Sequence, residues 1–266
     1  MTAPDDDLQE KHRKPFVEHL GDLRSVILWS GASLLVGMLA AIPLAPRVVQ
    51  LVKIPLAKAG VNPDEFLRVF TVSAGFSMAM KIIFWMGILL SLPVIVYQIG
   101  RFVFPGLTQR ERRAVLYASG FAGFLFVGGV AIGYFFAVSA ALKCLLRIND
   151  WLGVSCAFVD LSDYIAFVLQ LLVCFGAAFE LPVVILALGA LGIVSHAGLR
   201  DKRRHAIVAL LFLAMVLTPS ADAITMLIMA VPLILLYEFC IWAVRFMERR
   251  AGARTRFQVS GARDQG

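Results

Sequence analysis

The sequence predicts an all-α integral membrane protein with six transmembrane helices, both termini in the cytoplasm, and an external cap of short helices. Hydrophobic residues make up 60% of the 266 residues and charged residues only 16%. The mean hydropathy is +0.82, well above that of an ordinary soluble domain. Apolar segments also recur at the length that a bilayer requires. We therefore expect one transmembrane domain at 25–248, between a cytoplasmic arm (1–24) and a basic cytoplasmic tail (249–266) that is disordered.

Six apolar segments follow one another along the chain. The first could be mistaken for a secretory signal, but acidic residues precede it and "AAIPLAP" is a poor cleavage site, so we interpret it as a retained span. The segments cover 25–44, 82–104, 115–142, 164–194, 206–218 and 224–244.

The fifth segment is unusually short. Its roughly 13 residues rise about 20 Å as a helix, against a hydrocarbon core of about 30 Å. The turn "TPSAD" then ends it with a proline and a carboxylate. Two interpretations are open: the bilayer is thinned around this hairpin, or the helix extends into "RDKRRH" on the cytoplasmic side.

Positive charge predicts the orientation. Most of the 25 lysines and arginines lie in the N-terminal arm, the second and fourth loops and the tail, which places both termini in the cytoplasm. The net charge of +7 is then explained by a basic rim beside anionic lipid, without nucleic acid. The external segment 45–75 has an amphipathic pattern that includes Pro55, and we expect short helices that cap the bundle.

Motifs for catalysis are absent from the sequence. There is no phosphate-binding loop, no H-E-x-x-H and no G-x-S-x-G, and the four histidines lack neighbours at metal-ligand spacing. We therefore expect no enzyme activity, no metal and no cofactor. Cys144 and Cys156 lie in or beside an external loop, where a disulfide is one possibility that spacing alone does not decide.

Carboxylates stand at informative places. Glu18 and Asp22 share one face of a helix before the first span, a pattern that an ordinary solvated amphipathic segment also shows. Glu111 lies among arginines in the second loop, where an ion pair with Arg112 or Arg113 is the simpler interpretation. Glu180 lies in the middle of an apolar segment. An unpaired charge there is costly, so we expect it to face the inside of the bundle, to pair with a donor or water, or to be protonated.

Four strings together resemble the TatC family, the multispanning core subunit of the twin-arginine protein translocase. They occur in order across the six apolar segments, and the similarity covers about 16–246. The strings are "EHLGDLR" (18–24), "SLPVIVYQIGRFVFPGLTQRERR" (91–113), "FGAAFELPVVI" (175–185) and "LTPSAD" (217–222).

The resemblance implies a receptor for the paired arginines of signal peptides on folded precursors. The family's two recognition acids fall on Asp22 and Glu111, with Glu18 and Phe102 shaping the site. A guanidinium accepts a bidentate carboxylate that a lysine cannot copy. Asp22 is one methylene shorter than the family's usual glutamate, which affects its reach.

The resemblance also implies roles within the membrane. Glu180 would line a concave face that receives single-span partners and the signal's hydrophobic segment, and Pro182 would bend the helix there. Another possibility for Glu180 is a neutral acid hydrogen-bonded within the bundle. Residues that would pack against a partner helix are Met215, Thr218, Pro219 and Asp222.

The resulting hypothesis is a signal-peptide receptor and Tat core in the cytoplasmic (inner) membrane. Its partners would be TatA- and TatB-type single-span subunits, membrane lipid and further copies of itself, and the proton motive force would drive export of folded proteins. One alternative is a secondary transporter or proton channel with Glu180 and Glu238 as a relay, which inverted repeats would favour. A second is a scaffold without its own recognition site.

Overall fold

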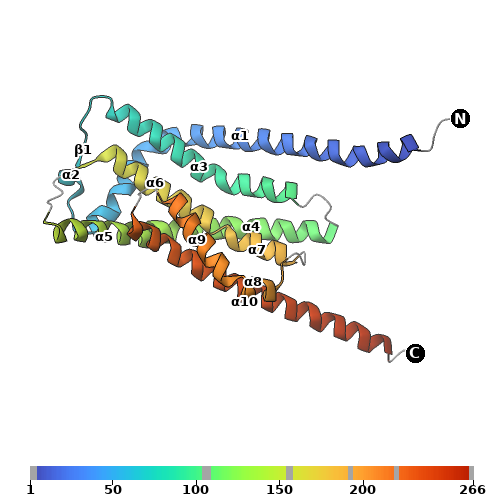
Figure 1. Cartoon of the computed structure of the whole chain (residues 1–266). Coiled ribbons are helices and arrows are strands. Elements are labelled where there is room, and N and C mark those ends of the chain that lie inside the picture. Colours follow the sequence, from blue (N-terminus) through green and yellow to red (C-terminus); the bar gives the residue numbers. More distant parts are fainter. Residues whose placement is uncertain (1–4, 104–108, 154–157, 191–193, 219–221, 264–266) are drawn as a thin grey trace.

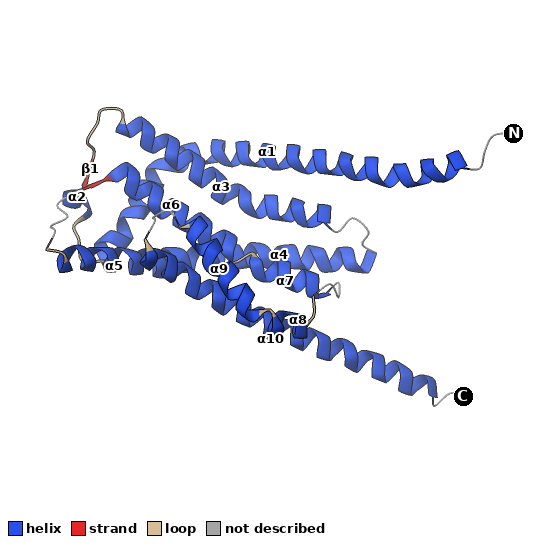
Figure 2. Ribbon diagram, viewed as in Figure 1, coloured by secondary structure: helices blue, strands red, loops and turns tan. Residues whose placement is uncertain are grey.

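The computed structural model describes residues 5–103, 109–153, 158–190, 194–218 and 222–263. Within these ranges, the side chains of 5–20, 22, 101, 103, 109–120, 190 and 250–263 are not described. The described part is almost entirely helical (Figure 2), as the sequence predicts.

Long helices that run side by side form the molecule (Figure 1). The start of α1 and the end of α10 lie at one end, which we call the terminal end, and α2 and β1 lie at the other, which we call the loop end. The elements are α1 (Asp5–Lys58), α2 (Pro63–Phe66), β1 (Leu67–Arg68), α3 (Ala74–Val103), α4 (Gln109–Ile132), a π-helical turn η1 (Gly133–Ala137), α5 (Val138–Trp151), β2 (Val159–Asp160), α6 (Leu161–Ala178), α7 (Leu181–Ala190), α8 (His196–Asp201), α9 (Arg203–Leu217) and α10 (Ala223–Arg263).

Five stretches of helix in the described residues are long and apolar enough to cross a membrane. They coincide with five of the six apolar segments of the sequence: Leu23–Lys58, Ala74–Gly100, Phe121–Trp151, Leu161–Gly189 and Ala223–Arg249.

The sixth segment forms α9, whose 15 residues correspond to about 22 Å of helix. It begins three residues earlier than the apolar pattern predicts, and Lys202 separates it from α8. The extension into the basic stretch is therefore short, and α9 remains shorter than the hydrocarbon core. Its crossing of the bilayer stays a prediction.

The expected cap of short helices is only partly right. Residues 45–58 are not separate helices, because α1 continues through them to Lys58, and Figure 1 shows the light-blue part of its ribbon turning away from the first part. Three of the prolines in α1, those near its end (Pro43, Pro46 and Pro55), favour such a change of direction, since each removes a helical hydrogen bond. Only α2 is a short separate helix in this region, and Asn62 caps it through the amide of Asp64.

The apolar segment 164–194 is interrupted rather than continuous. The helix stops at Ala178 and restarts at Leu181, so Phe179 and Glu180 form the break. Pro182 lies in the first turn of α7, where its missing N–H costs least. Pro182 cannot donate to the carbonyl four residues earlier, which favours ending α6 just there.

Glycines allow the helices to approach closely. A Cβ added to Gly37 in α1 would lie 2.7 Å from the carbonyl oxygen of Gly87 in α3. A Cβ on Gly129 in α4 would lie 2.7 Å from the Phe179 ring and 2.9 Å from the carbonyl oxygen of Phe175. Backbone contact of this kind is typical of helix pairs in membranes, where apolar burial supplies no driving force between helices.

A two-residue parallel pair joins two distant segments at the loop end. Leu67 pairs with Val159 and Arg68 with Asp160. Nearby, Lys53 forms an ion pair with Asp64 at 2.7 Å. The end of α1 and the segments before α3 and α6 are thus held together.

Helices extend toward both ends of the chain. α1 begins at Asp5, and α10 continues to Arg263. The arm at 1–24 and the disordered tail at 249–266 stay a prediction. Alanine, arginine and glutamine in this tail have good helix propensity, which favours a helical backbone.

Candidate functional site

Three sets of motif residues lie next to the ends of membrane-spanning helices. Glu18 and Asp22 belong to α1 and precede the span Leu23–Lys58 directly. Phe102 lies two residues beyond the span that ends at Gly100, and its side chain is half-buried and in contact with other groups. Glu111 belongs to the first turn of α4. The side chains of Glu18, Asp22 and Glu111 lie outside the described part.

The backbone brings these positions to one end of the molecule. Figure 1 shows the start of α1, the end of α3 and the start of α4 at the terminal end. The helices α1 and α3 are in extensive contact, and α3 also contacts α4. The arrangement gives a surface to which three helices contribute polar ends.

Glu180 is deeply buried, although it is a carboxylic acid. Its side chain is 5% exposed, and neither carboxylate oxygen has a hydrogen-bond partner among the described residues. It lies in the break between α6 and α7, next to the buried Pro182. Leaving a buried carboxyl group without partners costs several kcal/mol. The site therefore provides two acceptors for a donor from outside this chain, for water, or for a proton.

The end of α9 and the turn toward α10 combine exposed apolar side chains with internal hydrogen bonds. Met215 is 53% exposed on α9. The Thr218 hydroxyl donates to the carbonyl of Ala214 at 2.5 Å, and the Asp222 carboxylate accepts from the amide of Thr225 at 2.7 Å. Asp222 thereby caps the start of α10. Pro219 lies outside the described residues.

The end of α9 is also anchored from inside the bundle. The buried Cys174 thiol of α6 donates to the carbonyl of Leu217 at 2.8 Å. This carbonyl lies in the last turn of α9 and lacks an intrahelical partner. The contact fixes the end of the short helix against the core.

Polar contacts hold α8 and the start of α9 against α10. Arg203 forms an ion pair with Glu238, so Glu238 has a partner on a neighbouring helix rather than only extending toward the membrane surface. Tyr237 donates to the carbonyl of Leu199 at 2.9 Å, and the Glu248 carboxylate accepts from the His196 amide at 2.8 Å. No sequence pattern predicts this ion pair or these two hydrogen bonds.

Pro55 has a clear structural consequence at the loop end. Pro55 is buried and has no N–H, so the carbonyl of Leu51 loses its helical partner. The Tyr134 hydroxyl, from η1, donates to that carbonyl at 2.8 Å. Tyr164 of α6 donates to the next carbonyl, that of Val52, at 2.9 Å. The two tyrosines therefore attach the end of α1 to the third and fourth spans.

The cysteines include one free thiol near the loop end. Cys144 is half-buried in α5 and has no disulfide, while Cys156 lies outside the described residues. Cys174 and Cys240 are buried in spans. In the described residues no three metal-ligating side chains come together.

Most of the chain resembles known proteins. The family model of the Sec-independent protein translocase protein TatC matches residues 18–232. The chain belongs to the TatC family. It is therefore related to components of a protein translocase, and it is a multi-pass protein of the cytoplasmic membrane.

Individual TatC proteins agree with this assignment over most of their length. The TatC protein of Deinococcus radiodurans is 37% identical over 226 residues, which cover 84% of this chain and 83% of the relative. That of Aquifex aeolicus is 32% identical over 236 residues, which cover 89% and 97% respectively.

Solved structures agree as well. A crystal structure described as the twin arginine translocase receptor TatC has a TM-score of 0.75 and 31% identity, and the match covers 86% of this chain and 98% of that one. A second, in the detergent DDM, has a TM-score of 0.74 and 32% identity.

Proposed function

We propose that this TatC-family chain is the receptor for twin-arginine signal peptides and the core of a Tat complex that exports folded proteins. The observation that carries the proposal is the position of the motif residues. Asp22 and Phe102 lie beside the ends of membrane spans, Glu111 lies in the first turn of the helix that leads into the third span, and these three helix ends lie at one end of the molecule. Membership of the translocase family favours this function over a secondary transporter.

The chemistry of recognition follows from two acids that meet two arginines. A guanidinium forms two parallel hydrogen bonds with a carboxylate, and lysine cannot copy this geometry. Each charged hydrogen bond contributes about 1.5 to 3 kcal/mol when it is partly desolvated. Asp22 and Glu111 are the acids that we assign to this role, with Glu18 and Phe102 beside them.

The orientation that the proposal needs places the terminal end in the cytoplasm. Basic residues are concentrated there, in α8, at the start of α9 and along the end of α10. The start of α1 and the end of α10 lie at the same end, as two cytoplasmic termini require (Figure 1). Excess lysine and arginine marks cytoplasmic segments of membrane proteins.

Within the membrane, we assign partner binding to two places. Glu180 offers two buried acceptors without partners among the described residues, which suits a polar group on a single-span helix. Met215 is exposed on α9 and is suited to close packing with such a helix. TatA- and TatB-type subunits are the partners that we propose, with further copies of this chain in the complex and the proton motive force as the energy source.

Binding of labelled signal peptides tests the receptor function. The purified protein in a lipid nanodisc is titrated with an Arg-Arg peptide and with its Lys-Lys counterpart. We expect preference for Arg-Arg, and we expect Asp22→Ala or Glu111→Ala to weaken that binding about tenfold or more, which is roughly 1.4 kcal/mol. Glu65→Ala, an exposed acid at the loop end, is the matched control and should leave binding unchanged.

The same titration can refute the proposal. Equal binding of both peptides, or equal weakening by the control variant, would show that the two acids do not read the paired arginines. If the chain alone binds neither peptide, the titration is repeated with a co-purified TatB-type subunit. Absence of preference there too would exclude the receptor function.

A further inference from the structure

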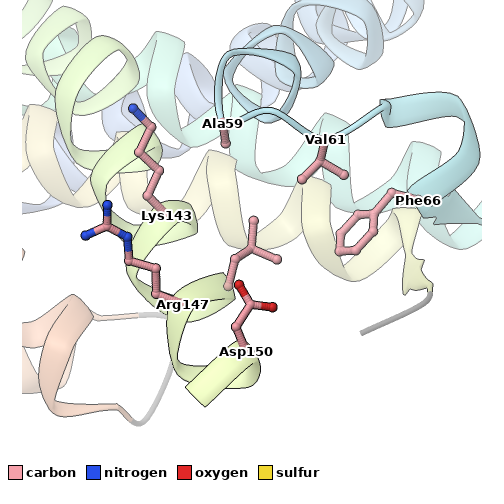
Figure 3. A pocket seen from close by; sticks show the side chains of 7 residues that line it. Ala59, Val61, Phe66, Lys143, Arg147 and Asp150 are labelled. Carbon is pink, nitrogen blue, oxygen red and sulfur yellow. The ribbon is translucent and has the colours of Figure 1, made fainter. Parts of the chain in front are cut away.

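A pocket of about 510 Å³ opens at the loop end, away from the residues assigned to signal recognition. Figure 3 shows its two walls: the segment that follows α1 provides one, and α5 provides the other. The volume lies in the range of small-molecule sites. The lining includes Ala59, Val61 and Phe66 on the first wall, and Lys143, Arg147 and Asp150 on the second.

The α5 wall has two positively charged side chains that form no ion pair in the described residues. Lys143 and Arg147 are four residues apart, so they project from the same face of the helix. Neither takes part in an ion pair in the described residues, whereas Lys53 and Lys81 nearby are paired with Asp64 and Asp163. Asp150 on the same wall forms no ion pair with either of them in the described residues, so both cations are available to an anion.

The pocket lies where the apolar surface of the helix gives way to a polar one. Phe135 and Phe136 are exposed, and Lys143 follows Phe136 by seven residues, which is about 10 Å along a helix. Trp151, at the end of α5, is 83% exposed. Tryptophan is enriched at the level of lipid headgroups. This order of exposed phenylalanines, cations and tryptophan is typical of a helix that passes through the headgroup level of a bilayer.

We propose that this pocket binds the headgroup of an anionic phospholipid. Lys143 and Arg147 hold the phosphodiester, and the apolar wall of Ala59, Val61 and Phe66 covers the carbon atoms of the headgroup. Lipid binding at this pocket requires only that the chain is a membrane protein with this fold, and it is independent of signal-peptide recognition.

Asp150 narrows the choice of headgroup. In Figure 3, the carboxylate of Asp150 lies on the side of Val61 and Phe66, whereas the charged groups of Lys143 and Arg147 lie farther from these two residues. A carboxylate accepts hydrogen bonds and repels a second phosphate, so it suits a headgroup that ends in donor hydroxyls. Phosphatidylglycerol has one phosphate and two such hydroxyls, whereas phosphatidylcholine is neutral overall and has no donor.

Native mass spectrometry of the full chain in detergent provides the test. The protein is mixed with equal amounts of phosphatidylglycerol and phosphatidylcholine that have the same acyl chains, and the retained lipids are counted. We expect one phosphatidylglycerol to be retained preferentially. The double variant Lys143→Gln/Arg147→Gln should weaken that binding about tenfold or more, equivalent to roughly 1.4 kcal/mol.

The matched control removes two other cations that line no part of this pocket. Arg47 in α1 and Arg68 in β1 are exposed, and Arg47→Gln/Arg68→Gln lowers the net charge by the same amount. The control should keep the preference for phosphatidylglycerol. An equal loss in both double variants, or no loss in Lys143→Gln/Arg147→Gln, would overturn the proposal.

Two further arms identify the ligand. Asp150→Ala should weaken phosphatidylglycerol binding. Stronger binding by this variant would show that Asp150 does not accept a hydrogen bond from the headgroup. Water-soluble glycerol phosphate should bind much more weakly than the lipid, because it lacks the acyl chains that lie against the exposed apolar surface at Phe135 and Phe136. Binding as tight as that of the lipid would overturn a lipid as the occupant. Thermal unfolding without added lipid checks that every variant is folded.

Discussion

The close contact between α1 and α3 predicts opposite effects for two similar substitutions. Gly37 and Gly31 are both in α1, but Gly37 is buried and Gly31 is exposed. A Cβ at position 37 would lie 2.7 Å from the carbonyl oxygen of Gly87, and a Cβ at position 31 would have nothing within 4 Å. Gly37→Ala should therefore force the two helices apart, and Gly31→Ala should not.

The magnitude follows from comparing the two variants. Each gains the same helix-forming term, because alanine in a helix is favoured over glycine by about 0.5 to 1 kcal/mol. Only Gly37→Ala adds the cost of overpacking, which is about 1 to 3 kcal/mol. The neighbour at position 37 is backbone rather than a flexible side chain, so α3 must move as a whole. The expected difference in unfolding free energy is thus about 1 to 3 kcal/mol.

Reversible unfolding in mixed detergent micelles, followed by far-UV circular dichroism, measures this difference. We expect Gly31→Ala to be as stable as the parent protein or slightly more stable, and Gly37→Ala to be less stable than both. If Gly37→Ala were as stable as Gly31→Ala, the close approach of α1 and α3 would be wrong.

Three further predictions use the same unfolding assay. Tyr164→Phe removes the buried hydroxyl that reaches the Val52 carbonyl and should cost about 1 to 3 kcal/mol; an unchanged stability would mean that this bond does not form. Asp163→Asn breaks the exposed pair with Lys81 and should cost less than about 1 kcal/mol, falling further in 1 M salt; a large cost independent of salt would contradict this. Glu180→Gln should change stability by less than about 1.5 kcal/mol, since no described donor is lost, while transport of a Tat substrate should fall; a larger loss of stability would reveal a partner within the chain.

Much of the fold could be predicted from hydropathy, because membrane spans are long apolar segments with few competing patterns. Five of the predicted segments coincide with helices of spanning length. Local sequence patterns did not predict the structure where it depends on contacts with distant parts of the chain. Two tyrosine hydroxyls from other spans bind carbonyls in the last turns of α1, and the pairing of Leu67 with Val159 involves strands too short to have a period.

The candidate site also has features that the sequence predicts and features that it does not predict. Glu180 is identifiable in the sequence because a carboxylate in an apolar segment is rare, and its burial follows. The helix break beside it is less visible, since Pro182 alone indicates only that the helix is disturbed nearby. The pocket beside α5 was missed, because its walls come from residues about 80 positions apart and neither wall has a recognisable motif.

The tyrosine contacts with the end of α1 impose an order on the biogenesis of the protein. The carbonyls of Leu51 and Val52 receive their donors from residues 83 and 112 positions later in the chain. When the first span leaves the ribosome and enters the membrane, those donors have not yet been synthesised. The last turns of α1 therefore reach their final hydrogen bonding only after the fourth span has been inserted, so a translation product that stops before Tyr164 should expose this end of α1 to membrane proteases.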